Sequence, residues 1–455
     1  MGLSAQICET VAALQPGDPP PSTLTAAKHV LLDASGVILG ASGLASEAQP
    51  FIAVARAAGA GPSAILGTGH RVAPGMAALA NGSMAHALDY EDAFDRKPGH
   101  PNASLVPALI ALAQSEGPVS GPDFLAALAI GCDISCRIGL ALRQDMEVGG
   151  WYPPPIVAGL GASVGAAKLL GLGADGIRDA LSMALCQITM PGVIKHSRDT
   201  VIRAVREGFP AQAAVTSALL AREGVAGFEE PLEGRDGFYA LYADSKFDPV
   251  DLTEGLGQRF WIDALTFKPW PSCRGTHPFI ELALNLRERH GFAPADIAAI
   301  TASFDDVQAM LIEPLSRKAA PQTLIDAKFS IPFATALALV RGKVDLDSFS
   351  QDALADAEVL AVAALVQGRQ GGRPDWQRGS GGLLEIALKD GRILTAEIDN
   401  ALGCPARPLD EAELVAKFVD CAGRAARPLA PAAAEALATR ILSLEQCDDV
   451  GALLV

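Results

Sequence analysis

Residues 23–39 read TLTAAKHVLLDASGVIL, and the spacing of their apolar side chains decides the class of fold. Apolar residues recur at i, i+3 and i+4 after a start rich in Ser and Thr, as in an amphipathic helix with an N-cap. The pattern is repeated and each repeat ends at Gly, Pro or a charged cluster: residues 73–88, 122–142, 156–170, 174–186 and 211–222. The sequence therefore predicts an all-α bundle between about residues 22 and 256.

The pattern changes after Trp261. Residues 296–304 are rich in β-branched side chains, and two strand-like runs, 383–388 and 392–398, flank the hairpin signal Asp390-Gly391. Helical patterns at 326–339 and 351–366 lie between them, and the last fifty residues are again helical. We predict a mainly α protein with a large all-α helical domain made from both chain ends, 1–264 and 404–455, and a smaller α+β domain at 265–403.

The composition predicts a large core of small side chains. Of the 455 residues, 50% are hydrophobic and only 5% aromatic, and the net charge of −16 opposes binding to nucleic acid. The apolar runs at 103–113 and 156–167 are shorter than the roughly 20 residues that span a membrane. The N-terminus lacks the basic region of a secretory signal. We expect a cytoplasmic protein that binds neither membrane nor nucleic acid.

Neither a structural metal nor a dinucleotide is expected. The eight cysteines include no Cys-x-x-Cys pair and have no nearby His at zinc-finger spacing. The sequence GLGASVG at 159–165 resembles a dinucleotide loop, but its last Gly is one residue late and no strand precedes it. Small residues at this spacing indicate instead that two helices approach closely.

Two segments carry candidate catalytic groups, and the first is NGSMAHALDYEDAFDRKPGHPN at 81–102. His86 and Asp89 are three residues apart at the end of an apolar helix and are expected to share a face. Asp92, Asp95 and His100 follow in a loop bounded by Gly and Pro. Carboxylates beside a histidine suit acid/base catalysis, although a capped, solvated turn would have the same composition.

The second segment is FKPWPSCRGTH at 267–277, at the presumed domain junction. Lys268, Arg274 and His277 precede or begin a helix, and Ser272 and Cys273 lie between them. A helix N-terminus with nearby cations is suited to bind a carboxylate. The segment predicts a pocket for a small anionic molecule, and the alternative is a rigid linker with solvated charges.

Five stretches together resemble the MmgE/PrpD family, whose members include 2-methylcitrate dehydratase, cis-aconitate decarboxylase and iminodisuccinate epimerase. The resemblance runs in order along the chain through residues 85–113, 157–172, 207–234, 268–284 and 327–342. It implies a cofactor-free enzyme, without a metal, that forms a homodimer. It also implies that the α+β domain is a lid and that the substrate pocket lies between the domains.

The resemblance also suggests roles for individual residues. Asp89 matches the family's active-site aspartate, His100 the histidine of its His-Pro motif, and Lys268 its hinge lysine. Several positions depart from the family: Ala93 stands where Thr is often found, Tyr152 where a His is expected, Arg203 in place of a Lys, and Cys273 in place of the decarboxylase-type His. Arg203 can bind a carboxylate but cannot release a proton.

These observations predict a lyase that acts on a di- or tricarboxylic acid by removing a proton α to a carboxylate. Dehydration of a citrate-type 2-hydroxy acid is the first expectation; the alternatives are epimerisation or isomerisation of an amino- or tricarboxylate, cis-aconitate-type decarboxylation, or carboxylate binding without catalysis. The catalytic candidates are Asp89, His100, Lys268 and Tyr152, and the substrate-binding candidates are Arg203, Ser272, Cys273, Arg274, His277 and His86. Replacing Lys268 or His100 with Ala is expected to abolish turnover with the melting temperature nearly unchanged.

Overall fold

The computed structural model describes residues 2–97, 99–197 and 200–454, and the chain divides into two compact units. The helical unit comprises Met1–Ala87, Glu91–Leu265 and Asp410–Val455, and the α+β unit comprises Leu88–Tyr90 and Thr266–Leu409. Prediction from the sequence placed the boundaries at 264/265 and 403/404 and did not anticipate the transfer of Leu88–Tyr90 to the α+β unit. The prediction of a mainly α fold with a small α+β part is confirmed.

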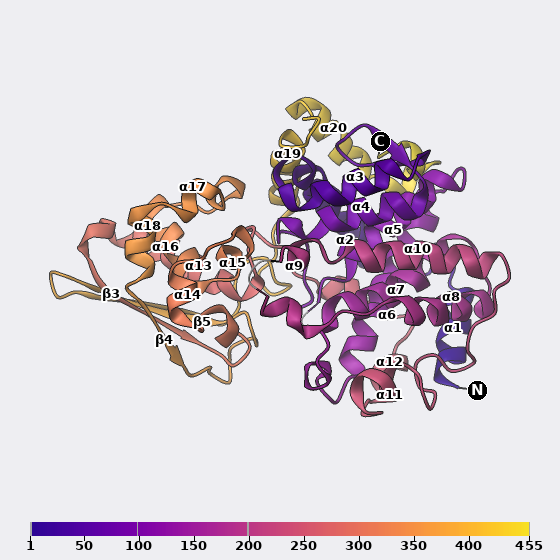
Figure 1. The fold of residues 1–455 in the computed structure, drawn as a ribbon, viewed down its shortest axis with the longest axis horizontal. Helices are drawn as coiled ribbons and strands as arrows, with labels where there is room; N and C mark the ends of the chain where they lie inside the picture. The colour runs from indigo at the N-terminus through magenta and orange to yellow at the C-terminus, as the bar shows by residue number, and fades with distance from the viewer. Residues whose placement is uncertain (1, 98, 198–199, 455) are drawn as a thin grey trace. The chain divides into compact units, whose positions relative to one another are not determined.

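The helical unit is built from both ends of the chain. Its C-terminal helix α19 packs against α2, and Figure 1 shows the yellow C-terminal helices in the same unit as the indigo N-terminal ones. A short antiparallel hairpin, β1–β2, joins the helices and was not predicted. The elements of this unit are α1 (Leu3–Ala13), α2 (Pro21–Leu44), α3 (Gln49–Ala57), β1 (Ala60–Ile65), β2 (His70–Val72), α4 (Pro74–Ala87), α5 (Pro101–Ser115), α6 (Gly121–Ala141), α7 (Pro153–Leu169), α8 (Ala174–Gln187), α9 (Ile202–Val205), α10 (Gly208–Arg222), α11 (Phe238–Ala243), α12 (Pro249–Thr253), α19 (Glu411–Gly423) and α20 (Pro431–Leu442).

Small residues bring the central helices of this unit close together. A Cβ atom added to Gly161 of α7 would collide with the main-chain oxygen of Gly131 in α6, so the close-approach interpretation of the 159–165 glycines is confirmed. Likewise, a Cβ on Gly82 of α4 would lie 2.7 Å from the carbonyl oxygen of Glu207, directly before α10. The absence of side chains at these positions lets α4 and the start of α10 come into backbone contact.

Helices α2 and α6 are long and apolar enough to cross a membrane by length and composition alone. Neither helix contains an uninterrupted apolar run of that length, so neither was predicted as a possible membrane span. Within the structure, 72% of the apolar window of α2 and 94% of that of α6 are buried. Both helices therefore lie in the core of the helical unit, where apolar side chains are expected on every face.

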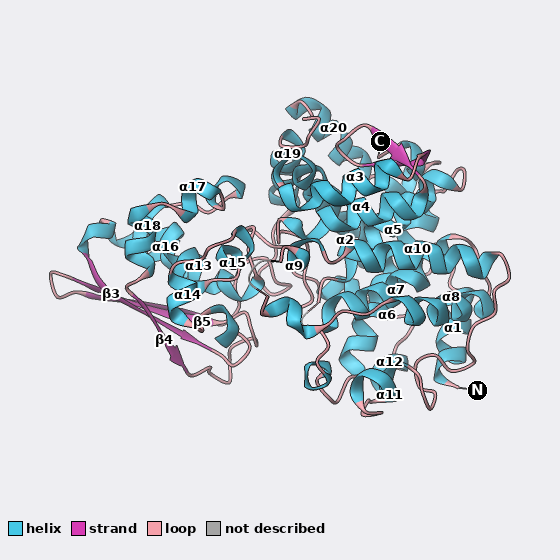
Figure 2. Ribbon diagram, in the orientation of Figure 1, coloured by secondary structure: helices cyan, strands magenta, loops and turns pink. Residues whose placement is uncertain are grey.

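The α+β unit contains a sheet with the strand order β4-β3-β5-β6 among the described residues. Strands β5 and β6 form the antiparallel hairpin predicted around Asp390-Gly391, and Gly391 has φ +93°. Helix α13 packs against β5 and β6, and Figure 2 shows the helices of this unit beside the magenta strands. The elements are α13 (His277–His290), β3 (Ile297–Phe304), α14 (Leu315–Ala319), α15 (Leu324–Lys328), α16 (Ile331–Arg341), α17 (Gln351–Leu354), α18 (Ala357–Ala363), β4 (Val366–Gln370), β5 (Gly382–Leu388) and β6 (Ile393–Ile398).

Two predicted helices of this unit are interrupted, and one strand was missed. The helix predicted at 326–339 is two helices, because Ser330 caps α16 with its side chain and Pro332 lies in the first turn. The helix predicted at 351–366 is interrupted at Asp356, which caps α18. Strand β4 has only one buried residue, Val366, and pairs in parallel with β3, so no alternating apolar pattern marks it.

Candidate active site

Helix ends place the candidate residues of the helical unit. His86 lies in the last turn of α4, and His100 and Tyr152 directly precede α5 and α7. The next residue after His100 and after Tyr152 is a proline in the first helical turn, which keeps its predecessor out of the helical conformation. The helix therefore starts after the functional side chain, and that side chain projects from the helix entrance.

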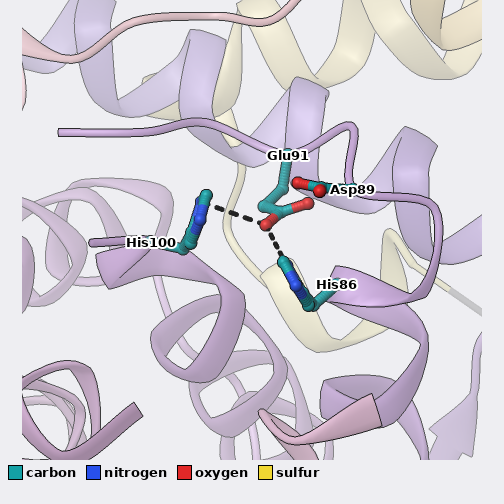
Figure 3. A group of neighbouring side chains, drawn as sticks. All are labelled: His86, Asp89, Glu91 and His100. Carbon is teal, nitrogen blue, oxygen red and sulfur yellow. Dashed lines mark hydrogen bonds and ion pairs between the residues drawn. The ribbon is translucent and has the colours of Figure 1, made fainter. Parts of the chain in front are cut away.

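Glu91 joins the two histidines. Its Oε1 atom contacts Nδ1 of His86 and lies 3.0 Å from Nδ1 of His100, as Figure 3 shows. The side chains of Glu91 and His86 are fully buried, whereas that of His100 is 16% exposed. A buried carboxylate is costly unless it is hydrogen-bonded, and the histidine N–H groups supply such bonds.

Arg206 and Glu207, between α9 and α10, extend this arrangement into the core. The guanidinium Nη1 atom of Arg206 contacts Nε2 of His86, and its Nε atom lies 3.1 Å from Oε1 of Glu207. Glu207 also accepts a hydrogen bond of 2.7 Å from the Ser104 hydroxyl. Burial raises the pKa of Glu207, and the neighbouring Arg206 opposes that shift. We call Glu207, Arg206, His86, Glu91 and His100 the buried polar network.

The contacts of Nδ1 determine the tautomer of neutral His100. Nδ1 lies 2.9 Å from the carbonyl oxygen of Asp92 and 3.0 Å from the carboxylate of Glu91, and both of these groups are acceptors. The proton of the neutral ring is therefore on Nδ1, and Nε2 carries the lone pair. A ring in this form can take a proton from a substrate through Nε2.

Tyr152 and Arg203 lie next to the buried polar network. The Tyr152 ring is 5.1 Å from the guanidinium carbon of Arg206, a cation–π contact, and Tyr152 is 8% exposed. Arg206 also donates a hydrogen bond of 2.7 Å to the main-chain oxygen of Arg203. The structure thus brings four predicted residues, His86, His100, Tyr152 and Arg203, to one region of the helical unit.

His86, Glu91 and His100 have potential metal-ligand atoms within 4.8 Å of one another. The arrangement suits hydrogen bonding better than metal binding, because the ring nitrogens already face protein groups: Nε2 of His86 faces a guanidinium, and Nδ1 of His100 faces a carbonyl oxygen. A metal ion here would be placed close to the positive charge of Arg206.

In the α+β unit, Asp89 and Lys268 form a buried ion pair. Lys268 is fully buried, its Nζ contacts Oδ1 of Asp89, and it donates a second hydrogen bond of 3.1 Å to the main-chain oxygen of Asp89. Asp89 has φ +51°, a left-handed conformation that is uncommon outside glycine. Helix α4 ends at Ala87, so the prediction that His86 and Asp89 share a helical face is wrong.

The remaining candidates surround the start of α13. Arg274 donates hydrogen bonds to the main-chain oxygens of Leu402 and Ala401 and to the Ser380 hydroxyl. The Ser272 hydroxyl lies 2.8 Å from that of Thr276. These bonds fix the conformation of the segment, and substrate binding by Ser272, Cys273 and Arg274 stays a prediction.

His277 is neutral in the folded protein. Its Nε2 donates a hydrogen bond of 3.1 Å to the carbonyl oxygen of Ser272, and its ring packs edge-on against Trp270. Burial lowers its pKa well below the ordinary value of 6.5, and the charges of Arg274 and Lys268 lower it further. His277 is therefore a neutral polar group near neutral pH, and its role in substrate binding stays a prediction.

The neutral state of His277 predicts acid sensitivity. Between pH 6.5 and the lower pKa of the folded state, the unfolded chain binds a proton that the folded chain does not. The stability contribution of His277 is thus complete above pH 6.5 and decreases below it, by up to about 1.4 kcal/mol per pH unit. Melting temperatures measured above and below pH 6.5 should decrease less steeply in His277→Gln than in the wild type. Equal slopes in the two proteins would contradict the assignment.

Three residues of the buried polar network were not predicted: Glu91, Arg206 and Glu207. Glu91 lies within the segment at 81–102, but Asp89, Asp92 and Asp95 were the carboxylates considered there. Arg206 and Glu207 are adjacent charges between two apolar helices, where exposure to solvent would be the ordinary interpretation. The signal available in the sequence was the Gly208 that follows, since a glycine at a helix start suggests close backbone approach.

The chain is similar in sequence to proteins of one enzyme family along most of its length. Residues 5–249 match the MmgE/PrpD N-terminal domain, and residues 270–443 match the MmgE/PrpD C-terminal domain. The cis-aconitate decarboxylase-like protein oryM of Aspergillus oryzae (strain ATCC 42149 / RIB 40) is 29% identical over 77% of this chain and 76% of its own length. Cis-aconitate decarboxylase of Mus musculus is 26% identical over 84% of this chain and 78% of its own. The Aspergillus terreus cis-aconitate decarboxylase is 24% identical over 100% of this chain and 95% of its own.

Proposed function

Because the chain belongs to the MmgE/PrpD family, we propose that it is a lyase that acts on a di- or tricarboxylic acid without a metal or organic cofactor. The observation that carries the proposal is the environment of His100. Its Nδ1 atom lies 2.9 Å from the Asp92 carbonyl oxygen, which can only accept a hydrogen bond, so the proton is on Nδ1 and Nε2 is the basic atom of a partly exposed ring. The names of the relatives, which are cis-aconitate decarboxylases, support a carboxylic acid as the substrate.

The reaction that suits a neutral base is dehydration of a 2-hydroxy acid of the citrate type. Nε2 of His100 removes the proton α to a carboxylate, and the electron pair of that C–H bond forms the new C=C bond. The hydroxyl group leaves from the β-carbon as water after accepting a proton, for which the Tyr152 phenol is the predicted donor. Arg203 binds a carboxylate and stabilises the charge that develops on it in the transition state.

Decarboxylation is the second candidate, and the names of the relatives favour it. In that reaction the carbon–carboxylate bond breaks, CO₂ leaves, and the carbanion accepts a proton. The acid that donates this proton would be His100 in its protonated form. Cys273, which stands where the decarboxylases that the chain resembles have a histidine, and Arg203, which cannot release a proton, support dehydration instead.

A turnover screen tests the proposal. Citrate, 2-methylcitrate, cis- and trans-aconitate and iminodisuccinate are offered to the pure protein with and without EDTA, in deuterated water, and the products are followed by proton NMR. We expect water loss from a 2-hydroxy acid, seen as a new alkene signal, at the same rate with EDTA.

Each other outcome of the screen selects a different function. Release of CO₂ supports the decarboxylase candidate, and deuterium incorporation without an alkene supports epimerisation. Loss of turnover with EDTA contradicts the metal-free proposal. Calorimetric binding of a carboxylate with no conversion of any acid would overturn the enzymatic proposal in favour of a carboxylate-binding protein.

A further inference from the structure

We propose that Glu91 is the positioning residue that fixes the His100 ring in its reactive tautomer, and that the buried polar network behind Glu91 keeps its carboxylate in place. The catalytic part of this inference, that His100 acts as a base, rests on the proposed function. Its structural content, the tautomer of His100 and its dependence on Glu91, can be measured without a substrate.

Solvent reaches only one end of the buried polar network. The side chains of Glu207, Arg206, His86 and Glu91 have no exposed area, and only His100 is accessible, at 16%. A reactant in solution can therefore meet the network only at His100. The four other members act through this histidine, and none of them is expected to touch a substrate.

The donors and acceptors of the network can be assigned in only one way. Arg206 has only donors, so Nε2 of His86, which its guanidinium contacts, must be an acceptor. The proton of neutral His86 is then on Nδ1 and is donated to Glu91. Glu91 consequently accepts a hydrogen bond from His86 and lies 3.0 Å from Nδ1 of His100, which is the role of an ionised carboxylate.

An ionised Glu91 has two consequences for His100. Its negative charge lies 3.0 Å from Nδ1 and favours a proton on that atom, which already faces the Asp92 carbonyl oxygen, so that the lone pair is on Nε2. It also lies 3.0 Å from the ring that becomes an imidazolium when it takes a proton from the substrate. A negative charge that water cannot screen stabilises that imidazolium more strongly than an exposed one would.

The close packing of α4 against the start of α10 provides the rigid support. Gly82 and Gly208 let the two backbones touch, and this contact brings Arg206 next to His86 in the last turn of α4. A catalytic group is effective when its own supports are held in place, and here the supports come from helices rather than loops. Glu91 is thus held from behind by His86 and Arg206.

The first measurement uses the wild-type protein. The seven histidines are labelled with ¹⁵N, long-range ¹H–¹⁵N correlations distinguish protonated from unprotonated ring nitrogens, and the His100 signals are those lost in His100→Gln. We expect a single neutral tautomer with the proton on Nδ1. A wild-type His100 with its proton on Nε2 would overturn the inference without the need for any variant.

The second measurement compares Glu91→Gln with a matched control, Asp133→Asn. Asp133 is also a fully buried carboxylate of the helical unit, but it pairs with Arg137 within α6. In Glu91→Gln, we expect the His100 signals to show both tautomers and kcat to fall by about 10²-fold while KM changes by no more than about twofold. In Asp133→Asn, we expect a lower melting temperature with the His100 tautomer and kcat unchanged.

The outcomes separate this inference from the proposed function. If the wild type converts no acid but Glu91→Gln disturbs the His100 tautomer, the positioning role stands and the proposed function does not. If the wild type is active and Glu91→Gln retains both the tautomer and kcat, the positioning role is refuted. If Glu91→Gln does not fold, Glu91→Asp, whose shorter carboxylate cannot contact both histidines in the same way, replaces it with the same expected results.

Discussion

Replacing Lys268 with alanine is expected to lower the free energy of unfolding by about 3–5 kcal/mol and to abolish the proposed turnover. Lys268 is fully buried in an ion pair with Asp89, which itself is only 1% exposed. Removing the ammonium group leaves the buried Asp89 carboxylate without its cation. The free-energy cost of this unpaired charge is larger than that of the lost packing contacts. The expectation from the sequence alone, an unchanged melting temperature, is therefore replaced for this residue.

The loss of turnover follows from the position of Asp89 in the chain. Lys268 holds Asp89 through both its side chain and its main-chain oxygen, and it does so while Asp89 has φ +51°. Strained conformations of this kind persist only where neighbouring contacts enforce them. Asp89 is two residues before Glu91, so a relaxed backbone at Asp89 displaces the carboxylate that positions His100.

Chemical denaturation and a turnover assay measure the two effects separately. The control is the double variant Asp89→Asn with Lys268→Met, which removes both charges and keeps similar volumes. The double variant should have most of the wild-type stability, because no uncompensated charge remains. It should be as inactive as Lys268→Ala. A single variant Lys268→Ala with wild-type stability would show that the ion pair contributes nothing to the fold.

Replacing His100 with alanine is expected to lower the proposed turnover by about 10²–10⁴-fold, the usual contribution of a general base, and to leave the melting temperature nearly unchanged. The side chain is partly exposed and precedes α5 without capping it. Its removal therefore creates little buried cavity. It also leaves Glu91 in contact with His86.

The control for His100 is chosen to match its surroundings. His100→Asn retains a donor that can bond the Asp92 carbonyl oxygen but provides no base, and it should be as inactive as His100→Ala. His70, at the start of β2 and only partly buried, serves as an unrelated histidine, and His70→Ala should keep full activity. Wild-type turnover in His100→Asn would remove His100 from the mechanism.

Much of the candidate site was visible in the sequence, because catalytic residue types were concentrated in two short segments. His86, His100 and Lys268 were selected there and are next to charged partners in the structure. The partners themselves were assigned differently. Asp89 was predicted as a catalytic residue beside His100, whereas the carboxylate that lies 3.0 Å from Nδ1 of His100 in the structure is that of Glu91, and Asp89 pairs with Lys268. Which of two nearby carboxylates faces a histidine depends on a backbone turn that composition does not reveal.

The fold was predictable to the extent that its signals are local. Apolar periodicity identified most helices of the helical unit, and Asp390-Gly391 identified the β5–β6 hairpin. The Ser/Thr cap expected for the first of these helices is not formed, because α2 begins at Pro21 and its N-cap is Pro20 without a side-chain hydrogen bond. Strand β4 was missed because its residues are mostly exposed and its pairing with β3 is parallel, so that the evidence for it lies in a partner about 65 residues away.

The sequence by itself determined the mainly helical class, the return of the C-terminal helices to the first unit, and the residue types available for catalysis, because periodicity and composition are properties of neighbouring residues. Only the tertiary structure decided that Arg206 and Glu207 are buried behind His86, that Glu91 lies between two histidines, and that Asp89 pairs with Lys268. These contacts join residues up to 179 positions apart. For the contact of Arg206 with His86, the physical cause is the close approach of helices that lack side chains at Gly82 and Gly208, which excludes water and leaves buried polar groups with one another as partners.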